Sequence, residues 1–148
     1  MKTFCLQILV IISLTAVATL LTWKFHPRAP ALYLNAEPLG DGEISIEDAL
    51  QREAQGGVIW IDSRAEAKFE TRHIPGAILL NEFDFNRLLM ESFHLIANQD
   101  RPIVVYCGSY SCKASTKIAD ELRAKMIPDV YVLKGGWQAW LERAGDKP

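Results

Sequence analysis

Short apolar runs alternate along this chain with longer stretches in which apolar residues recur every three or four positions. The runs are rich in valine and isoleucine and are bounded by glycine, proline or polar residues, which is typical of buried strands. The longer stretches have the spacing of helices that bury one face. The predicted strands are residues 58–62, 102–107 and 129–133, together with a strand in residues 73–80 that begins after a turn at Pro75 and Gly76. The predicted helices are residues 45–56, 65–72, 83–99, 113–126 and 135–145.

This alternation of strands and helices continues over residues 43–145. It predicts an α/β fold with a parallel sheet flanked by helices on both faces. The chain of 148 residues is long enough for one such domain with its own core. In open sheets of this class, ligands bind beyond the carboxyl ends of the strands, so we expect a functional site at that edge.

The segment before this domain has a different pattern. Residues 4–23 carry no charge and are long enough to cross a bilayer as one helix. After a short N-terminus, residues 1–3, we expect them to form a transmembrane anchor or uncleaved signal, because cleaved signals have shorter apolar cores. Small residues at 29–31 leave a cleaved signal peptide as the alternative. Residues 24–42 are predicted to be a linker, and the domain is expected to be membrane-anchored and periplasmic or extracellular.

The composition excludes several function classes. Sixteen basic residues against 18 acidic ones give a net charge of −2, with no basic run of the kind that binds nucleic acid. Three cysteines and three histidines show no zinc-site spacing and are too few for a disulfide scaffold. We therefore expect no nucleic-acid partner, no metal and no organic cofactor.

The strand over residues 102–107 ends in a cysteine, Cys107, at the edge where ligands are expected. The backbone N–H groups of residues 108–113 and the positive end of the next helix would favour a negative charge on its sulfur. Such surroundings lower a cysteine pKa from about 8.5 to about 3.5–7.5, which makes the thiolate a nucleophile at neutral pH. The alternative is a buried cysteine that only ends a core strand.

Four segments resemble the rhodanese-like domain family over about residues 43–143. They are "IDSR" at 61–64, "RHIPGAILL" at 72–80, "VVYC" at 104–107 and "VYVLKGGWQAW" at 130–140. The resemblance implies an α/β sheet and a cysteine that carries a sulfane sulfur as a persulfide between a donor and a nucleophilic acceptor. Cys107 is the residue that matches the family's catalytic cysteine.

The loop after Cys107 departs from the family pattern. Rhodaneses commonly carry arginine or lysine in this loop, whereas here it reads Gly108, Ser109, Tyr110, Ser111, Cys112, Lys113, with the first cation at the sixth position. Fast transfer from anionic thiosulfate is therefore less expected. The spacing from Cys107 to Lys113 is that of the Cys-x5-Arg loop of related phosphatases, in which the arginine binds two phosphate oxygens. Lysine lacks the planar guanidinium that makes both bonds, so phosphatase or arsenate-reductase chemistry is not the expected function.

The second thiol of the loop, Cys112, is the other departure. If the loop arches over Cys107, the two residues come within the Cα separation of a disulfide, and Cys112 would act as a resolving thiol. The alternative is a small residue at a helix N-terminus. Asp62 and Arg64 follow a strand end near the same edge, and the resemblance implies a mainly structural role for them. We expect Asp62 to accept backbone N–H bonds and Arg64 to pair with an acid, and a direct contact with substrate is the alternative.

Three functions remain open from the sequence. The first is a sulfurtransferase that passes a persulfide sulfur from Cys107 to a thiol or a cyanide-like acceptor, with a small sulfur compound or a protein thiol as its partner. The second is a thiol-disulfide redox protein that uses Cys107 and Cys112. The third is a catalytically inactive rhodanese fold that serves as a binding module at the membrane.

Overall fold

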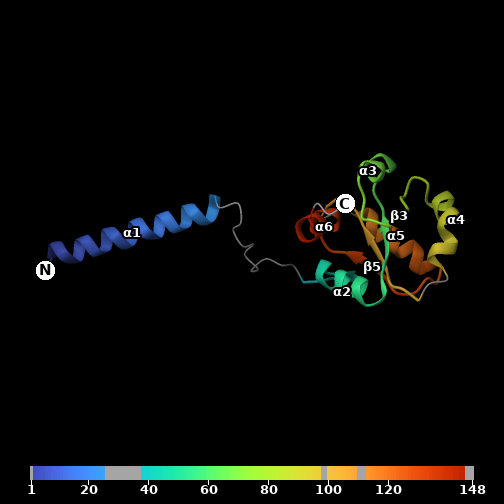
Figure 1. The fold of residues 1–148 in the computed structure, drawn as a ribbon, viewed down its shortest axis with the longest axis horizontal. Helices are drawn as coiled ribbons and strands as arrows, with labels where there is room; N and C mark the ends of the chain where they lie inside the picture. The colour runs from blue at the N-terminus through green and yellow to red at the C-terminus, as the bar shows by residue number, and fades with distance from the viewer. Residues whose placement is uncertain (1, 26–37, 98–99, 110–112, 146–148) are drawn as a thin grey trace. The chain divides into compact units, whose positions relative to one another are not determined.

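The computed structural model describes residues 2–25, 38–97, 100–109 and 113–145, and in the first range it describes the side chains of residues 7–19 only. The chain divides into two compact units, Met1–Glu37 and Pro38–Pro148. Each unit is considered by itself (Figure 1).

The first unit contains helix α1 (Lys2–Phe25). The transmembrane anchor predicted for residues 4–23 is not confirmed. Within the described part of the chain, no helix is long and apolar enough to cross a membrane.

The second unit is built on a five-stranded sheet in the order β1-β5-β4-β2-β3, and every pair of neighbours is parallel. The predicted parallel α/β sheet is therefore confirmed. The strands are β1 (Glu43–Ile44), β2 (Ile59–Asp62), β3 (Ile78–Leu79), β4 (Ile103–Tyr106) and β5 (Val130–Leu133). The sequence pattern did not indicate β1, because two residues are too few to form an apolar run.

The helices of this unit cover both faces of the sheet, as predicted. Side chains that alternate along β2, β4 and β5 point to opposite faces and build two separate cores. One core is closed by α4 and α5 and the other by α2 and α6, and Figure 1 shows these two pairs on opposite sides of the strands. The helices are α2 (Ile46–Gly56), α3 (Glu66–Thr71), α4 (Phe85–Ile96), α5 (Lys113–Ala124) and α6 (Gly136–Ala144).

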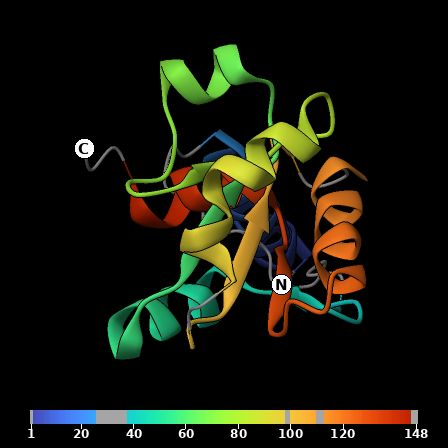
Figure 2. The same cartoon turned by 90° about the vertical axis from the view of Figure 1, so that its right-hand side faces the viewer.

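The strand register places the ends of β2 and β4 side by side. Asp62, the last residue of β2, pairs with Tyr106, the last residue of β4. In Figure 2, β4 is the golden arrow in the middle of the domain, and it points toward the end at which α3 lies. Residues that follow β2 and β4 therefore meet at the edge where the sequence places the site.

Candidate active site at Cys107

Cys107 follows β4 directly and is almost fully buried, with 2% of its surface exposed. Its backbone carbonyl accepts a hydrogen bond from the N–H of Trp137 in the first turn of α6, at 2.7 Å. Its Sγ lies 3.6 Å from the carbonyl oxygen of Ser109. The sulfur is disulfide-bonded in the structure, so Cys107 is present in an oxidised form.

Gly136 allows α6 to approach Cys107 this closely. A Cβ at Gly136 would collide with the carbonyl oxygen of Cys107 and would lie 3.1 Å from its carbonyl carbon. The φ angle of Gly136 is 54°, a left-handed value that side chains disfavour. Gly136 is thus needed where the backbone of α6 packs on the backbone of Cys107.

The loop itself is described only at its two ends. Gly108 and Ser109 belong to the described residues, whereas Tyr110, Ser111 and Cys112 lie outside them. Lys113 is the first residue of α5 and is exposed. The predicted ring of amides around the sulfur and the resolving role of Cys112 therefore stay predictions.

A buried polar network joins the ends of β2 and β4. The Asp62 carboxylate accepts hydrogen bonds from the backbone N–H of Arg64 at 2.9 Å and from the Tyr106 hydroxyl at 2.8 Å. The Arg64 guanidinium binds both carboxylate oxygens, with its closest nitrogen at 2.7 Å. Asp62 thus accepts a backbone N–H, and Arg64 pairs with an acid, which is Asp62 itself.

The same network holds the segments on either side of Cys107. The Tyr106 hydroxyl accepts the backbone N–H of Ile74 at 3.1 Å, which fixes the turn before β3. The Tyr106 carbonyl accepts both the backbone N–H and the hydroxyl of Ser63, at 2.9 and 2.8 Å. Two successive carbonyls, those of Tyr106 and Cys107, are therefore held by Ser63, which follows β2, and by Trp137 of α6.

Burial and charge keep these groups in fixed protonation states. Burial raises the pKa of the Tyr106 phenol far above its usual range, and the nearby Asp62 carboxylate raises it further. Burial by itself lowers the pKa of the Arg64 guanidinium, but its hydrogen bonds and charge interaction with Asp62 outweigh that effect and raise it. Tyr106 is a neutral donor and Arg64 a cation throughout the physiological range.

We expect the native chain to lose stability at alkaline pH because of Tyr106, and we expect the Tyr106→Phe variant to lack this loss. The unfolded tyrosine loses its proton near pH 10, whereas the folded one keeps it because its pKa is raised. The contribution of Tyr106 is therefore fully present below about pH 10 and falls above it, by up to about 1.4 kcal/mol per pH unit. Denaturant unfolding at about pH 9 and about pH 11 measures this slope.

The control for this prediction is Tyr131→Phe, at a half-buried tyrosine on β5. The gap in stability between the native chain and the Tyr106→Phe variant should narrow as the pH rises. A difference in unfolding free energy that stays constant across this pH range would show that folding does not raise the pKa of the Tyr106 phenol.

Trp137 and Arg72 are parts of the site that the sequence analysis did not assign. The Trp137 ring stacks on Tyr106 with centroids 6.2 Å apart, and the guanidinium carbons of Arg64 and Arg72 lie 4.5 and 5.8 Å from its centroid. The position of Trp137 directly after two glycines was the available signal. Nothing local in the sequence indicated that Arg72 would reach this ring.

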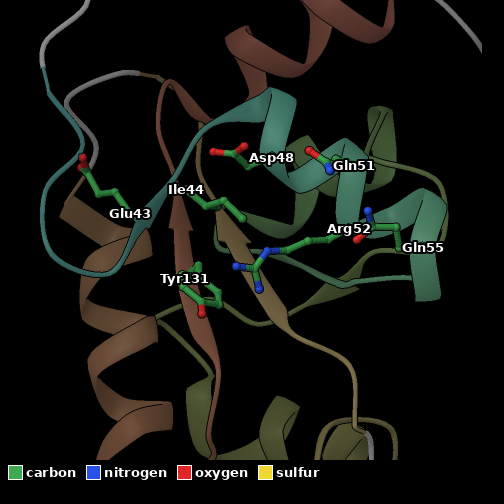
Figure 3. A pocket seen from close by; sticks show the side chains of 7 residues that line it. All are labelled: Glu43, Ile44, Asp48, Gln51, Arg52, Gln55 and Tyr131. Atoms are coloured by element: carbon green, nitrogen blue, oxygen red, sulfur yellow. The ribbon is translucent and has the colours of Figure 1, made fainter.

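A separate hollow lies away from Cys107. It encloses about 460 Å³ between α2 and the strands β1 and β5. Figure 3 shows the Arg52 side chain extending from α2 toward Tyr131, and its guanidinium carbon is 4.8 Å from the Tyr131 ring centroid. None of its lining residues follows β2 or β4, so this hollow is separate from the Cys107 site.

In the part of the chain that the structure describes, no three side chains among histidine, cysteine, aspartate and glutamate gather as a metal site would require. What the described residues do provide is a buried cysteine at a strand end, whose carbonyl accepts a backbone hydrogen bond, and a neighbouring aromatic ring with two arginines near its face.

Comparison with known proteins identifies the family. A model of the rhodanese-like domain matches residues 45–143. The thiosulfate sulfurtransferase GlpE of Shewanella oneidensis is 32% identical over 99 residues, which cover 67% of this chain and 91% of that protein. The protein of the same name from Pseudomonas syringae pv. syringae is 32% identical over 97 residues, which cover 66% of this chain and 84% of that protein.

Solved structures share the fold. A protein from Bacillus halodurans superposes with a TM-score of 0.58 at 26% identity, covering 70% of this chain and 73% of that one. A rhodanese-related protein from Thermoplasma volcanium gives a TM-score of 0.52 at 19% identity, covering 72% and 94%. The matching family model, the curated relatives and the shared fold confirm the resemblance seen in the motifs: this chain belongs to the rhodanese-like domain family.

Proposed function

We propose that this protein is a sulfurtransferase that carries a persulfide on Cys107. The observation that supports this most is the placement of Cys107. It directly follows β4, only 2% of its surface is exposed, and its carbonyl is held by the backbone N–H of Trp137. Relatives at about 30% identity are named thiosulfate sulfurtransferases, which makes thiosulfate the first donor to test.

The proposed reaction has two displacements at sulfur. The Cys107 thiolate attacks the outer sulfur of thiosulfate, the sulfur–sulfur bond of the donor breaks, and sulfite leaves with the electron pair. An acceptor thiolate or cyanide then attacks the terminal sulfur of the persulfide, and Cys107 leaves as a thiolate. Neither step needs an oxidant or a cofactor, because the transferred sulfur exchanges one bond for another: a sulfur–sulfur bond breaks and a bond to the attacking sulfur, or to the carbon of cyanide, forms.

Mass spectrometry of the reduced protein after exposure to thiosulfate tests this proposal. We expect the peptide that contains Cys107 to gain the mass of one sulfur atom and to lose it when cyanide or a thiol is added. The Cys107→Ser variant should gain no sulfur and should transfer none to cyanide, a loss of at least about 10³-fold because the nucleophile is absent. Loading that is retained in Cys107→Ser would contradict the assignment of the nucleophile.

A second candidate function is supported by the oxidised state of Cys107. We propose Cys112 as the thiol that resolves the persulfide: its thiolate attacks the inner sulfur of the persulfide, hydrogen sulfide leaves, and a disulfide remains. This proposal rests on the spacing of the two residues and on the disulfide-bonded sulfur of Cys107. Thiosulfate, through the persulfide, is the oxidant in this scheme.

Hydrogen sulfide release separates the two functions. The persulfide form of the native chain, without an added acceptor, should release hydrogen sulfide and close a disulfide, whereas Cys112→Ser should keep its persulfide. Cys5→Ser is the matched control, because it removes the third thiol outside the family domain. If Cys112→Ser released sulfide as fast as the native chain, the resolving role would be excluded; if no variant loaded sulfur, the binding module would be favoured.

A further inference from the structure

The hollow between α2 and the strands β1 and β5 is a second candidate site, separate from Cys107 (Figure 3). Its volume of about 460 Å³ lies within the roughly 300–1,000 Å³ that is usual for pockets that bind small molecules. Ile44, which is 4% exposed, and the half-buried Tyr131 give it an apolar lining. The charged side chains beside this lining decide what kind of molecule the hollow can hold.

Arg52 brings a positive charge into this hollow without a counter-ion. Its guanidinium carbon lies 4.8 Å from the centroid of the Tyr131 ring. This cation–π contact is not a hydrogen bond, so it leaves the N–H donors of the guanidinium unused. Among the described residues, no carboxylate pairs with Arg52. The guanidinium is therefore held over an aromatic ring with donors that can bind a carboxylate.

Asp48 lies four residues before Arg52 on α2 and lines the same hollow. Side chains at this spacing are neighbours on a helix, with Cβ atoms about 5–6 Å apart, and opposite charges there usually attract each other. In the described part of the chain these two form no ion pair, and Figure 3 shows the Arg52 side chain extending away from Asp48 and toward Tyr131. Asp48 Oδ2 accepts the Ser45 hydroxyl at 2.8 Å, which leaves Oδ1 for a ligand.

Glu43 is the other acid of the lining, but its charge is already balanced. Its carboxylate accepts the backbone N–H of Gly40 at 2.8 Å and the ammonium group of Lys134 at 3.1 Å. The hydrogen bond from Gly40, assisted by Lys134, lowers the pKa of the Glu43 carboxyl, although burial acts in the opposite direction. Of the charged lining residues that the structure describes, Arg52 and Asp48 are therefore the two without an ion-pair partner.

We propose that this hollow binds a free α-amino acid with an apolar side chain. The carboxylate of the ligand binds the Arg52 guanidinium, its ammonium group binds Asp48, and its side chain lies against the apolar lining. Two opposite charges that stand side by side without pairing match a molecule that carries both charges on one carbon atom. An ion of a single sign would satisfy only one of them. The site is independent of Cys107 and of the proposed sulfur transfer.

Calorimetric titration of the full chain with three related compounds tests this proposal. L-leucine carries both charges, L-leucinamide lacks the carboxylate, and N-acetyl-L-leucine lacks the ammonium group. We expect L-leucine to bind about 10- to 100-fold more tightly than either derivative, because each derivative loses one charge-assisted hydrogen bond. Equal binding of the three compounds, or no binding of L-leucine, would overturn the proposal.

Two variants at exposed positions assign each charge to its residue. In Arg52→Gln the preference for L-leucine over L-leucinamide should disappear, while the preference over N-acetyl-L-leucine remains. In Asp48→Asn the reverse is expected, and the amide oxygen of asparagine can still accept the Ser45 hydroxyl. Arg87→Gln is the matched control, because it removes an exposed arginine on α4. Preferences that stay unchanged in the first two variants, or that change equally in Arg87→Gln, would contradict the assignment.

A second measurement locates the ligand directly. The NMR signal of the Arg52 Nε–H group, assigned by its absence in Arg52→Gln, should shift when L-leucine is added, whereas that of Arg87 should not. Cys107→Ser should give the same shift and the same affinity, because no residue that follows β4 lines the hollow. Binding that is lost in Cys107→Ser would place the ligand at the sulfur site and overturn the proposal.

Discussion

Replacement of Gly136 by alanine is expected to destabilise the domain by roughly 2–4 kcal/mol and to reduce sulfur transfer strongly. The added Cβ would meet the carbonyl of Cys107, which is backbone and has no flexible end that can move aside. The residue would also keep a φ of 54°, which is strained for alanine. Strain of this kind contributes about 1–3 kcal/mol, and a forced backbone shift contributes a similar amount.

Two other glycines separate these contributions. Gly145 has a φ of 66° but nothing within 4 Å of its Cβ position, so Gly145→Ala measures the strain of a left-handed residue alone. Gly56 has neither feature, and Gly56→Ala should be neutral or slightly stabilising at the end of α2. Denaturant unfolding of the three variants gives the comparison. A loss in Gly136→Ala no larger than that in Gly145→Ala would show that the close approach to Cys107 is unimportant.

Replacement of Asp62 by alanine is expected to lower the free energy of unfolding by about 3–5 kcal/mol. The carboxylate is fully buried and holds both Arg64 and the Tyr106 hydroxyl, so its removal leaves a largely buried cation without its counter-ion. We also expect sulfur loading to fall, because the ends of β2 and β4 would no longer be held together. Chemical denaturation and mass spectrometry after exposure to thiosulfate measure the two effects.

The control for Asp62 is an exposed ion pair on α4. Arg87 and Glu91 lie four residues apart with about half of each side chain exposed, 51% and 58%, and Glu91→Gln should lower stability by no more than about 0.5 kcal/mol. Asp62→Asn keeps the shape of the carboxylate but removes its charge, so it should fall between Asp62→Ala and the native chain. Equal losses in Asp62→Ala and Glu91→Gln would contradict the structural role of the buried network.

The sheet could be predicted from the sequence because its central strands are buried on both faces. Residues 58–62 and 102–107 read as continuous apolar runs, and the structure places β2 and β4 within them. Cys107 could be assigned because it ends such a run before a helix. Asp62 and Arg64 could be assigned because polar residues at a strand end must find partners when they are buried.

The rest of the site depends on contacts between segments far apart in the chain. Tyr106 reads as an ordinary strand residue, and only the fold shows that its hydroxyl lies between Asp62 and Ile74. Arg72 is a polar residue after a short helix, and its approach to Trp137 follows from how α3 and α6 meet at the sheet edge. Periodicity reports which face a residue occupies, but not which side chain of another element lies opposite.

The network around Cys107 also has a consequence for how the domain folds. The bonds of Tyr106 join residues that are 44, 43 and 32 positions away in the chain, at Asp62, Ser63 and Ile74. Contacts of such long range close large loops and form late, after local helices. A newly made chain would therefore have helical segments, and an accessible Cys107 thiol, before the fold positions Cys107. Protection of Cys107 from alkylation should appear only in the last phase of refolding.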